Sequence, residues 1–354
     1  MISCQHDLRL RIAVVDPCSS NGYDLSDLAA GGMGGTEASI LRVAASLKPR
    51  FDVAHYQNGR RSEHLSDVGR LCPLDQIDRQ PALQHDALIV INRWKVALRL
   101  RKLFPQAPIL LWLHVYPGRH NRGMGALLRA ANIDVICVSR SHAKRFLEFV
   151  VDGSEPRTHI IYNPIADELV PDTTVRDPNR LLFASSPHKG LAQVFAQFAA
   201  LKRHLPDLTL AIADPGYLKW DTGPAPEGAV FLGSLSHAAL VQEMRSCLCL
   251  FYPQTTFAET FGLVLTEANA VGTPVLVHDG LGANAEIVAD MQQRVNGHDD
   301  ADIRARIISW RQSLPRVTAN PGFRLSRVTE AWHQLLVQTA LTRTHSFKSC
   351  RLTA

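Results

Sequence analysis

The sequence lacks several features that mark common classes of protein. No apolar run approaches the ~20 residues that a helix needs to span a bilayer, and residues 1–7 lack the basic stretch and apolar core of a signal peptide. The 7 cysteines are scattered and form no C-x-x-C pair, which argues against a zinc knuckle or a redox motif. We therefore expect a cytoplasmic protein with reduced thiols.

Charge is modest in amount and uneven in position. Charged residues make up 20% and hydrophobic residues 46% of the 354 positions, which excludes a disordered chain and allows two domains with separate cores. The formal net charge is +5, and the positive excess lies in the first half. Such a mild bias predicts no nucleic-acid partner, but it suits an anionic acceptor or a peripheral contact with the inner face of an anionic membrane.

Short apolar strands alternate with helical patterns, which predicts α/β architecture. A linker rich in Pro, Asp and Thr follows residue 165. We expect one domain at 1–165 and a second at 166–320. The predicted strands of the first domain are Leu8–Val15, Asp52–Tyr56, Ala87–Ile91, Ile109–His114 and Val135–Val138.

The most informative stretch is residues 257–277, which is predicted to form a loop, a helix and a strand. Glu259 lies in the loop before the helix, and Glu267 lies about one turn inside it. Between them, the amides of Phe261, Gly262 and Leu263 have no partner within the helix and lie at its positive end. An anion flanked by polyols would suit this arrangement, as in a nucleotide diphosphate sugar.

The same stretch resembles glycosyltransferase family 4, through an E-x7-E motif with Thr260–Leu263 and Gly272–Val275 around it. A solvated helix face would explain bare glutamates at this spacing, but not the flanking residues. The resemblance implies the GT-B fold, with two Rossmann-like domains facing each other across a cleft. It also implies that Glu259 contacts the donor sugar and Glu267 the ribose.

A second part of the resemblance begins the second domain. Lys189 and Gly190 match the family's pattern, in which the lysine binds the donor diphosphate. The arginine usual at the preceding strand end is missing, and Ser185 and Ser186 stand in its place. We interpret this as variation, with the hydroxyls or another arginine as substitutes.

Three features of the first half belong to the same pattern. Gly34 and Gly35, ahead of Glu37, resemble the family's glycine-rich phosphate loop; a flexible turn without a ligand is the alternative. His114 resembles the histidine beside the donor sugar, although a histidine at a strand end is often structural. Ser139 is expected to cap a helix. The glycine loop is not a G-x-G-x-x-G followed by an acid, so a dinucleotide site is poorly supported.

Two charged segments allow bland interpretations. The basic helix near Arg93–Phe104 is expected to be a solvated face, with anionic lipid or a charged acceptor as the alternative. The D-x-D at Asp300–Asp302 follows a helix-capping Asp299 and is interpreted as part of a helix start, not a metal site. Residues 321–342 resemble the GT-B helix that crosses back to the first domain, and residues 343–354 are expected to be a disordered tail.

Together these features predict a retaining, metal-independent glycosyltransferase of the hexosyltransferase type. It would move sugar from a nucleotide diphosphate to a saccharide or lipid-linked acceptor, in surface polysaccharide or lipopolysaccharide synthesis. We expect no cofactor. The candidate catalytic residues are Glu259, Lys189 and His114. The candidate donor-binding residues are Gly34, Gly35, Ser185, Ser186, Lys189, Thr260, Phe261, Gly262, Leu263 and Glu267. A GT-B nucleotide-sugar epimerase, a non-catalytic nucleotide-sugar-binding subunit and, least favoured, a nicotinamide-dependent oxidoreductase are the alternatives.

Overall fold

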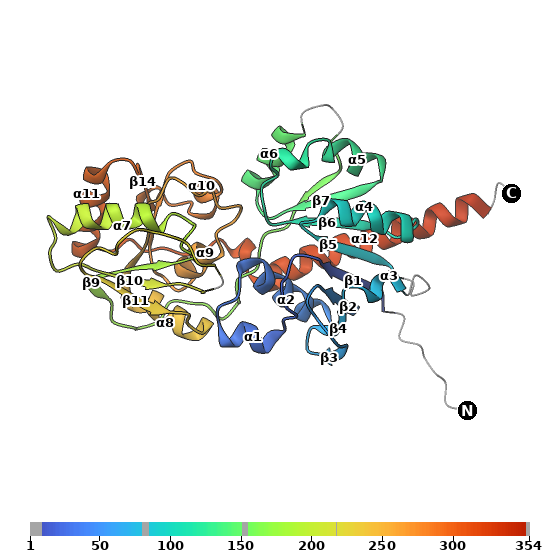
Figure 1. Ribbon diagram of the computed structural model, residues 1–354, viewed down its shortest axis with the longest axis horizontal. Helices are drawn as coiled ribbons and strands as arrows, with labels where there is room; N and C mark the ends of the chain where they lie inside the picture. Colours follow the sequence, from blue (N-terminus) through green and yellow to red (C-terminus); the bar gives the residue numbers. More distant parts are fainter. Residues whose placement is uncertain (1–8, 80–84, 151–154, 217, 352–354) are drawn as a thin grey trace.

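A computed structural model describes residues 9–79, 85–150, 155–216 and 218–351. These residues form two α/β units, each built around its own sheet (Figure 1). In both sheets the central strands run parallel, and their residues are almost continuously buried. Apolar runs of this kind are typical of parallel strands that are covered on both faces.

The first sheet has eight strands in the order β3-β4-β2-β1-β5-β6-β7-β8. All neighbours pair parallel except the β3–β4 hairpin. The strands are β1 (Arg11–Asp16), β2 (Asp52–Gln57), β3 (His64–Ser66), β4 (Gly69–Pro73), β5 (Ala87–Ile91), β6 (Ile109–Leu113), β7 (Ile133–Cys137) and β8 (Thr158–Ile160). The helices are α1 (Leu25–Ala30), α2 (Gly35–Leu47), α3 (Gln76–Arg79), α4 (Trp94–Leu103), η1 (Arg119–Asn121), α5 (Met124–Ala130) and α6 (Arg140–Phe149).

The second sheet has six strands in the order β11-β10-β9-β12-β13-β14. They are β9 (Asp177–Ala184), β10 (Thr209–Ala213), β11 (Ala229–Gly233), β12 (Cys247–Tyr252), β13 (Val275–His278) and β14 (Arg294–Val295). The helices are α7 (Leu191–Lys202), α8 (His237–Ser246), α9 (Leu263–Ala270), α10 (Asn284–Ile287), η2 (Met291–Gln293) and α11 (Asp300–Gln312). The chain then continues through η3 (Pro321–Phe323) into α12 (Leu325–Arg351).

Each sheet has a point where the strand order reverses, between β1 and β5 in the first and between β9 and β12 in the second. Ligands of open α/β sheets bind outside the carboxyl ends of the strands at such points. The loops that follow β1, β9 and β12 carry the predicted site residues Gly34, Lys189 and Glu259. All three residues therefore follow strands at the reversal points of the two sheets, where ligands are expected to bind.

Alternate residues of the first sheet pack into two separate cores. Ile12 and Val14 belong to a cluster that includes α2 and α12 and continues into the second domain. Ala13 and Val15 belong to a cluster with α4, α5 and α6 on the opposite face. This alternation follows from the two-residue period of a strand, and it gives the sheet a helical layer on each side.

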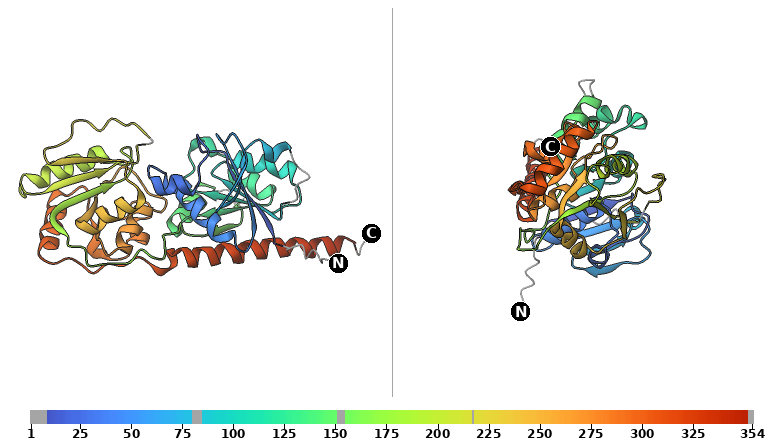
Figure 2. Two further views of the ribbon diagram at one scale, coloured as in Figure 1. Left: turned by 90° about the horizontal axis from the view of Figure 1, so that it is seen from below. Right: turned by 90° about the vertical axis from the view of Figure 1, so that its left-hand side faces the viewer.

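Helix α12 joins the two units. It leaves the second domain and runs along the first, where Figure 2 shows it as a long red helix. The Trp332 ring lies 4.8 Å from the ring of Trp112 on β6, and an isolated parallel bridge pairs Ile165 with Arg324. The predicted crossover helix is therefore present.

The prediction of a disordered tail needs correction. Helix α12 continues to Arg351 and includes most of the residues that we predicted to be disordered. No glycine or proline lies between Thr342 and Arg351 to end the helix. Sequence patterns also gave no prediction of α1, the β3–β4 hairpin, α3, α5, β8 or β14. These are short elements, and their local signals are weak.

Within the described residues, no helix combines the length and the apolar character needed to cross a membrane.

Four histidines of the first domain lie in surroundings that disfavour their charged form. Burial lowers the pKa of His55 and His114 to about 3 and of His85 and His142 to about 4. Each is therefore neutral in the folded protein at pH 7.

We predict that stability falls as the pH falls from about 6.5 towards 4. In the unfolded chain these histidines have pKa values of about 6.5 and become protonated as the pH falls, whereas in the folded chain they stay neutral. The free energy of unfolding therefore decreases by about 2 kcal/mol per histidine by pH 5. Denaturant unfolding at pH 7 and pH 5 measures the loss, and His55→Asn should reduce it. Substitution of the exposed His204 by Asn is the control; an equal effect of both variants would contradict the assignment.

Candidate functional site

Glu259 lies at the centre of the site, in the loop between β12 and α9. Its carboxylate accepts hydrogen bonds from Lys189 Nζ at 3.0 and 3.1 Å and from the Tyr252 hydroxyl at 3.1 Å. The residue is only 7% exposed. Burial and the neighbouring Glu259 carboxylate raise the pKa of Tyr252 well above its usual value, so the tyrosine stays a donor. Lys189 and Tyr252 together compensate a carboxylate that has been removed from water.

The turn after β9 positions Lys189. Gly190 caps helix α7 with a φ of +90°, and a Cβ at this position would lie 2.7 Å from Gln254 Cγ. Lys189 Nζ also lies 4.9 Å from the centre of the Phe257 ring. A glycine is thus required for the turn that brings the lysine to Glu259.

The serines of the same turn lie close to the site. Ser186 is buried, and its Oγ lies 2.9 Å from His188 Nδ1. This serine thus has a structural partner in the position where the resemblance implied an arginine.

The loop of Glu259 is bound to the first domain by three hydrogen bonds. The Thr260 hydroxyl donates to the His114 carbonyl at 2.9 Å, and the Ser139 hydroxyl donates to the Thr260 carbonyl at 2.7 Å. The Tyr116 hydroxyl donates to the Glu259 carbonyl at 3.0 Å. The ends of β6 and β7 therefore meet the loop that carries the first glutamate.

His114 is a neutral, buried side chain at this junction. Desolvation and the nearby His142 lower the pKa of its ring to about 3. Its Nε2 is buried and has no hydrogen-bond partner within the described part of the chain. The backbone amide of His114 donates to Asn92 Oδ1 at 2.7 Å, which holds the residue at the end of β6. A buried ring nitrogen without a partner costs free energy unless a ligand satisfies it.

Helix α9 begins at Leu263, as the sequence indicated. Its N-cap, Gly262, has a φ of +92°, a conformation that favours glycine. The Phe261 side chain is buried and lies 5.2 Å from the Phe323 ring. The Leu263 side chain lies 3.9 Å from a Cβ built on Gly35. The starts of α9 and α2 therefore converge from the two domains, and both present positive helix ends.

The glycine loop before α2 packs closely on the second domain. A Cβ at Gly31 would lie 2.0 Å from the Leu235 carbonyl oxygen. Gly34 is the N-cap of α2, and a Cβ there would lie 2.5 Å from Glu37 Oε2. Burial raises the pKa of the Glu37 carboxyl group. The close approach explains the need for glycines in this loop.

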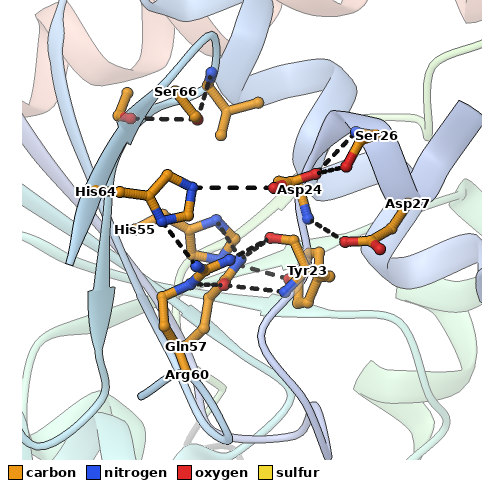
Figure 3. Close-up of polar contacts among 11 residues, drawn as sticks. Tyr23, Asp24, Ser26, Asp27, His55, Gln57, Arg60, His64 and Ser66 are labelled. Atoms are coloured by element: carbon orange, nitrogen blue, oxygen red, sulfur yellow. Dashed lines mark hydrogen bonds and ion pairs between the residues drawn. The ribbon is translucent and has the colours of Figure 1, made fainter. Parts of the chain in front are cut away.

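A polar cluster around Tyr23 holds the segment between β1 and α2 in place (Figure 3). The Tyr23 hydroxyl donates to Asp16 Oδ2 at 2.6 Å and lies 3.4 Å from His55 Nε2. Gln57 exchanges hydrogen bonds with the Tyr23 backbone, and Arg60 donates to the Tyr23 carbonyl at 3.0 Å. These bonds fix the segment that leads to Gly34 and Gly35.

Glu267 is 4% exposed and contacts one side chain from each domain. Its Oε1 accepts a hydrogen bond from Arg42 NH2 at 2.9 Å and lies 2.9 Å from His237 Nε2. Burial raises the pKa of this carboxyl group, but Arg42 and His237 outweigh burial, and the pKa is lowered. Glu267 is therefore ionised at neutral pH.

Glu286, on α10, forms a further junction between the domains. Its carboxylate accepts from the backbone amides of Arg140 and Ser141, at 2.9 and 2.8 Å, and from the Tyr162 hydroxyl at 2.9 Å. It thus satisfies the start of α6 across the domain boundary. Ser139 caps the same helix by accepting from the His142 amide, as predicted.

Asp299 caps α11 by accepting from the amides of Ala301 and Asp302, which confirms the interpretation of this acidic segment as a helix start. Among the described residues, no group of three His, Cys, Asp or Glu side chains is arranged to hold a metal ion.

Sequence patterns did not indicate several residues of the site: Arg42, Tyr252, His237 and Glu286. Arg42 is separated from Glu267 by 225 positions, and Glu286 from Ser141 by 145. Tyr252 had the strongest local signal, since it ends a buried strand at the reversal point of its sheet.

Part of the chain is similar in sequence to known enzymes. Residues 175–313 match the model of the family described as glycosyl transferases group 1. A curated phosphatidyl-myo-inositol mannosyltransferase from Mycolicibacterium smegmatis is 33% identical over 144 residues, which are 39% of this chain and 37% of that enzyme. Its namesake from Mycobacterium tuberculosis is 33% identical over 96 residues, 26% of this chain and 25% of the relative. The chain thus matches well under half the length of these relatives.

Solved structures match over nearly the whole chain. AviGT4, a glycosyltransferase involved in avilamycin A biosynthesis, superposes with a TM-score of 0.55 at 17% identity and covers 98% of this chain and 99% of its own. WaaG, a glycosyltransferase involved in lipopolysaccharide biosynthesis, gives 0.59 at 13% identity, with 91% and 94% covered. These matches establish the GT-B fold. The narrower assignment to family 4 and the roles of individual residues stay predictions.

Proposed function

We propose that this protein is a retaining, metal-independent glycosyltransferase that uses a nucleotide diphosphate sugar as donor. One observation carries the proposal: two buried glutamates bracket the start of α9, and the start of α2 faces it from the other domain. Helix starts attract phosphate, and carboxylates accept hydrogen bonds from sugar hydroxyls. The match of residues 175–313 to group 1 glycosyl transferases supports the same function.

In this proposal the diphosphate binds between Lys189 and the amides of Phe261, Gly262 and Leu263, with Gly34 and Gly35 closing over it. Positive charge placed where the leaving phosphate becomes more negative lowers the barrier. Glu259 and the neutral His114 bind hydroxyls of the transferred sugar, and Thr260 holds their two loops together. Glu267 binds the ribose.

We nominate no side chain as nucleophile. The acceptor hydroxyl attacks from the face that the leaving group vacates, and the departing diphosphate takes the hydroxyl proton, so that the configuration at the sugar carbon is retained. The contacts between the domains exclude water from this step, which favours transfer over hydrolysis.

For the acceptor, we propose a saccharide or glycolipid at the inner face of the cytoplasmic membrane, in surface polysaccharide or lipopolysaccharide synthesis. The curated relatives are named as mannosyltransferases of a phosphatidylinositol lipid. Helix α4 presents Lys95 and Lys102 at the surface, whereas Arg99 is paired with Asp78 and Arg101 is occupied by the backbone carbonyls of Ala107 and Ala131.

Nucleotide binding tests the proposal most directly. We expect one of UDP, GDP, ADP or CMP to raise the melting temperature by about 2–4 °C at one hundred times its Kd. Glu267→Ala should remove most of this shift. Glu330→Ala, at an exposed surface ion pair, is the control and should keep it. A wild-type melt that no nucleotide raises would contradict the proposal.

Lys189→Met should lower kcat about 10²–10³-fold, because the substitution removes the positive charge that stabilises the leaving phosphate. Lys144→Met, which removes an exposed lysine of α6 paired with Glu148, should leave kcat unchanged. Product analysis with and without acceptor separates transfer from the action of an epimerase, which would release free sugar without acceptor. Equal activity of Lys189→Met and wild type would exclude the assigned role.

Membrane contact is tested with vesicles. The Lys95→Glu/Lys102→Glu variant should bind vesicles of phosphatidylglycerol less tightly than the wild type does, by roughly 30-fold or more, since each basic residue near an anionic surface contributes about 1 kcal/mol. The pair Arg203→Glu/Lys219→Glu, at exposed positions of the second domain, is the control. Sedimentation that is equal for both variants, or absent for the wild type, would refute a lipid-binding α4.

A further inference from the structure

The proposed ribose carboxylate is held by one residue from each domain. Arg42, on α2, donates to Glu267 Oε1 at 2.9 Å, and His237, on α8, lies 2.9 Å from the same oxygen. The two partners of Glu267 also contact each other, with 3.2 Å between Arg42 NH2 and His237 Nε2. This three-residue junction is the most buried ionic contact between the domains.

Arg42 has a second anchor. Its NH1 donates to the Pro164 carbonyl at 3.2 Å, at the start of the segment that links the domains. The residue is 8% exposed. A planar guanidinium with two fixed partners orients a carboxylate more strictly than a lysine does. Arg42 therefore fixes the Glu267 carboxylate of the second domain relative to the first domain.

Both contacts end on one oxygen of the carboxylate. Within the described residues, Glu267 Oε1 accepts from Arg42 and His237, and Oε2 has no such partner. A free carboxylate oxygen held in a fixed direction can accept a hydrogen bond from a vicinal diol. The start of α2 lies about 10 Å along that helix from Arg42. Arg42 is thus at the ribose end of the proposed donor site, not at its phosphate end.

We propose that Arg42 is a positioning residue for the nucleotide ribose. It holds Glu267 so that Oε2 meets the ribose hydroxyls, and it does so only when the domains are together. This inference rests on the proposed function and names the residue that completes its ribose site.

The test compares ligands with and without ribose hydroxyls. Calorimetry measures Kd for UDP and GDP, for their 2′,3′-dideoxy counterparts and for pyrophosphate. For whichever nucleotide binds, Arg42→Met should raise Kd of the ribonucleotide about 10- to 100-fold. It should leave Kd of the dideoxy nucleotide and of pyrophosphate within about twofold. Arg42→Lys should fall between wild type and Arg42→Met.

Two further variants guard against a merely structural effect. Arg50→Met removes an exposed arginine paired with Glu330 and should change no Kd. Arg42→Met also leaves the buried Glu267 with fewer partners, so it is measured again on Glu267→Gln. Equal ribonucleotide Kd values for Glu267→Gln and the double variant are expected, because the two residues act as one unit.

Three results would overturn the inference. Equal weakening of ribonucleotide and dideoxy nucleotide would make Arg42 a phosphate ligand or a general structural contact. Tighter ribonucleotide binding by Arg42→Met would make Arg42 a competitor of the ribose. Further weakening of Glu267→Gln by loss of Arg42 would show independent roles. If the wild type binds no ribonucleotide, the proposed function itself fails, which is a separate result.

Discussion

The structure depends on compensating two carboxylates that have been taken out of water. An ionised carboxylate loses much of its hydration on burial, and only paired charge and hydrogen bonds restore the balance. Glu259 obtains Lys189 and Tyr252 from its own domain, whereas Glu267 obtains His237 from its own domain and Arg42 from the other. The partners of Glu259 therefore all come from one domain, whereas those of Glu267 come from both.

Local rules predicted much of the second domain. The glycine stop at Gly272 and the apolar run before Pro253 bracket α9, and the observed helix begins at Leu263 as expected. Caps at Ser139 and Asp299 were also predictable, because a cap depends on residues within one turn. The alternation of strands and helices predicted the α/β architecture, and the resemblance implied the GT-B fold, which the solved structures share.

The partners of the glutamates could not be predicted in this way. A salt bridge between α2 and α9 depends on how two sheets face each other, and no local pattern records that arrangement. The contact of Glu286 with the start of α6 is of the same kind. The extent of α12 was underestimated for a different reason: the last residues of a chain were expected to be disordered, although no glycine or proline between Thr342 and Arg351 stops the helix.

The missing arginine now has a physical setting. Ser185 and Ser186 stand at its position, and Ser186 is buried with its Oγ 2.9 Å from His188 Nδ1, so these two side chains supply no charge to a ligand. In the proposed donor complex, Lys189 must divide its charge between Glu259 and a diphosphate. The remaining positive potential then comes from the two helix starts, which act only when both are close to the phosphates. Domain closure would therefore matter more for phosphate binding here than in an enzyme with a full cationic clamp.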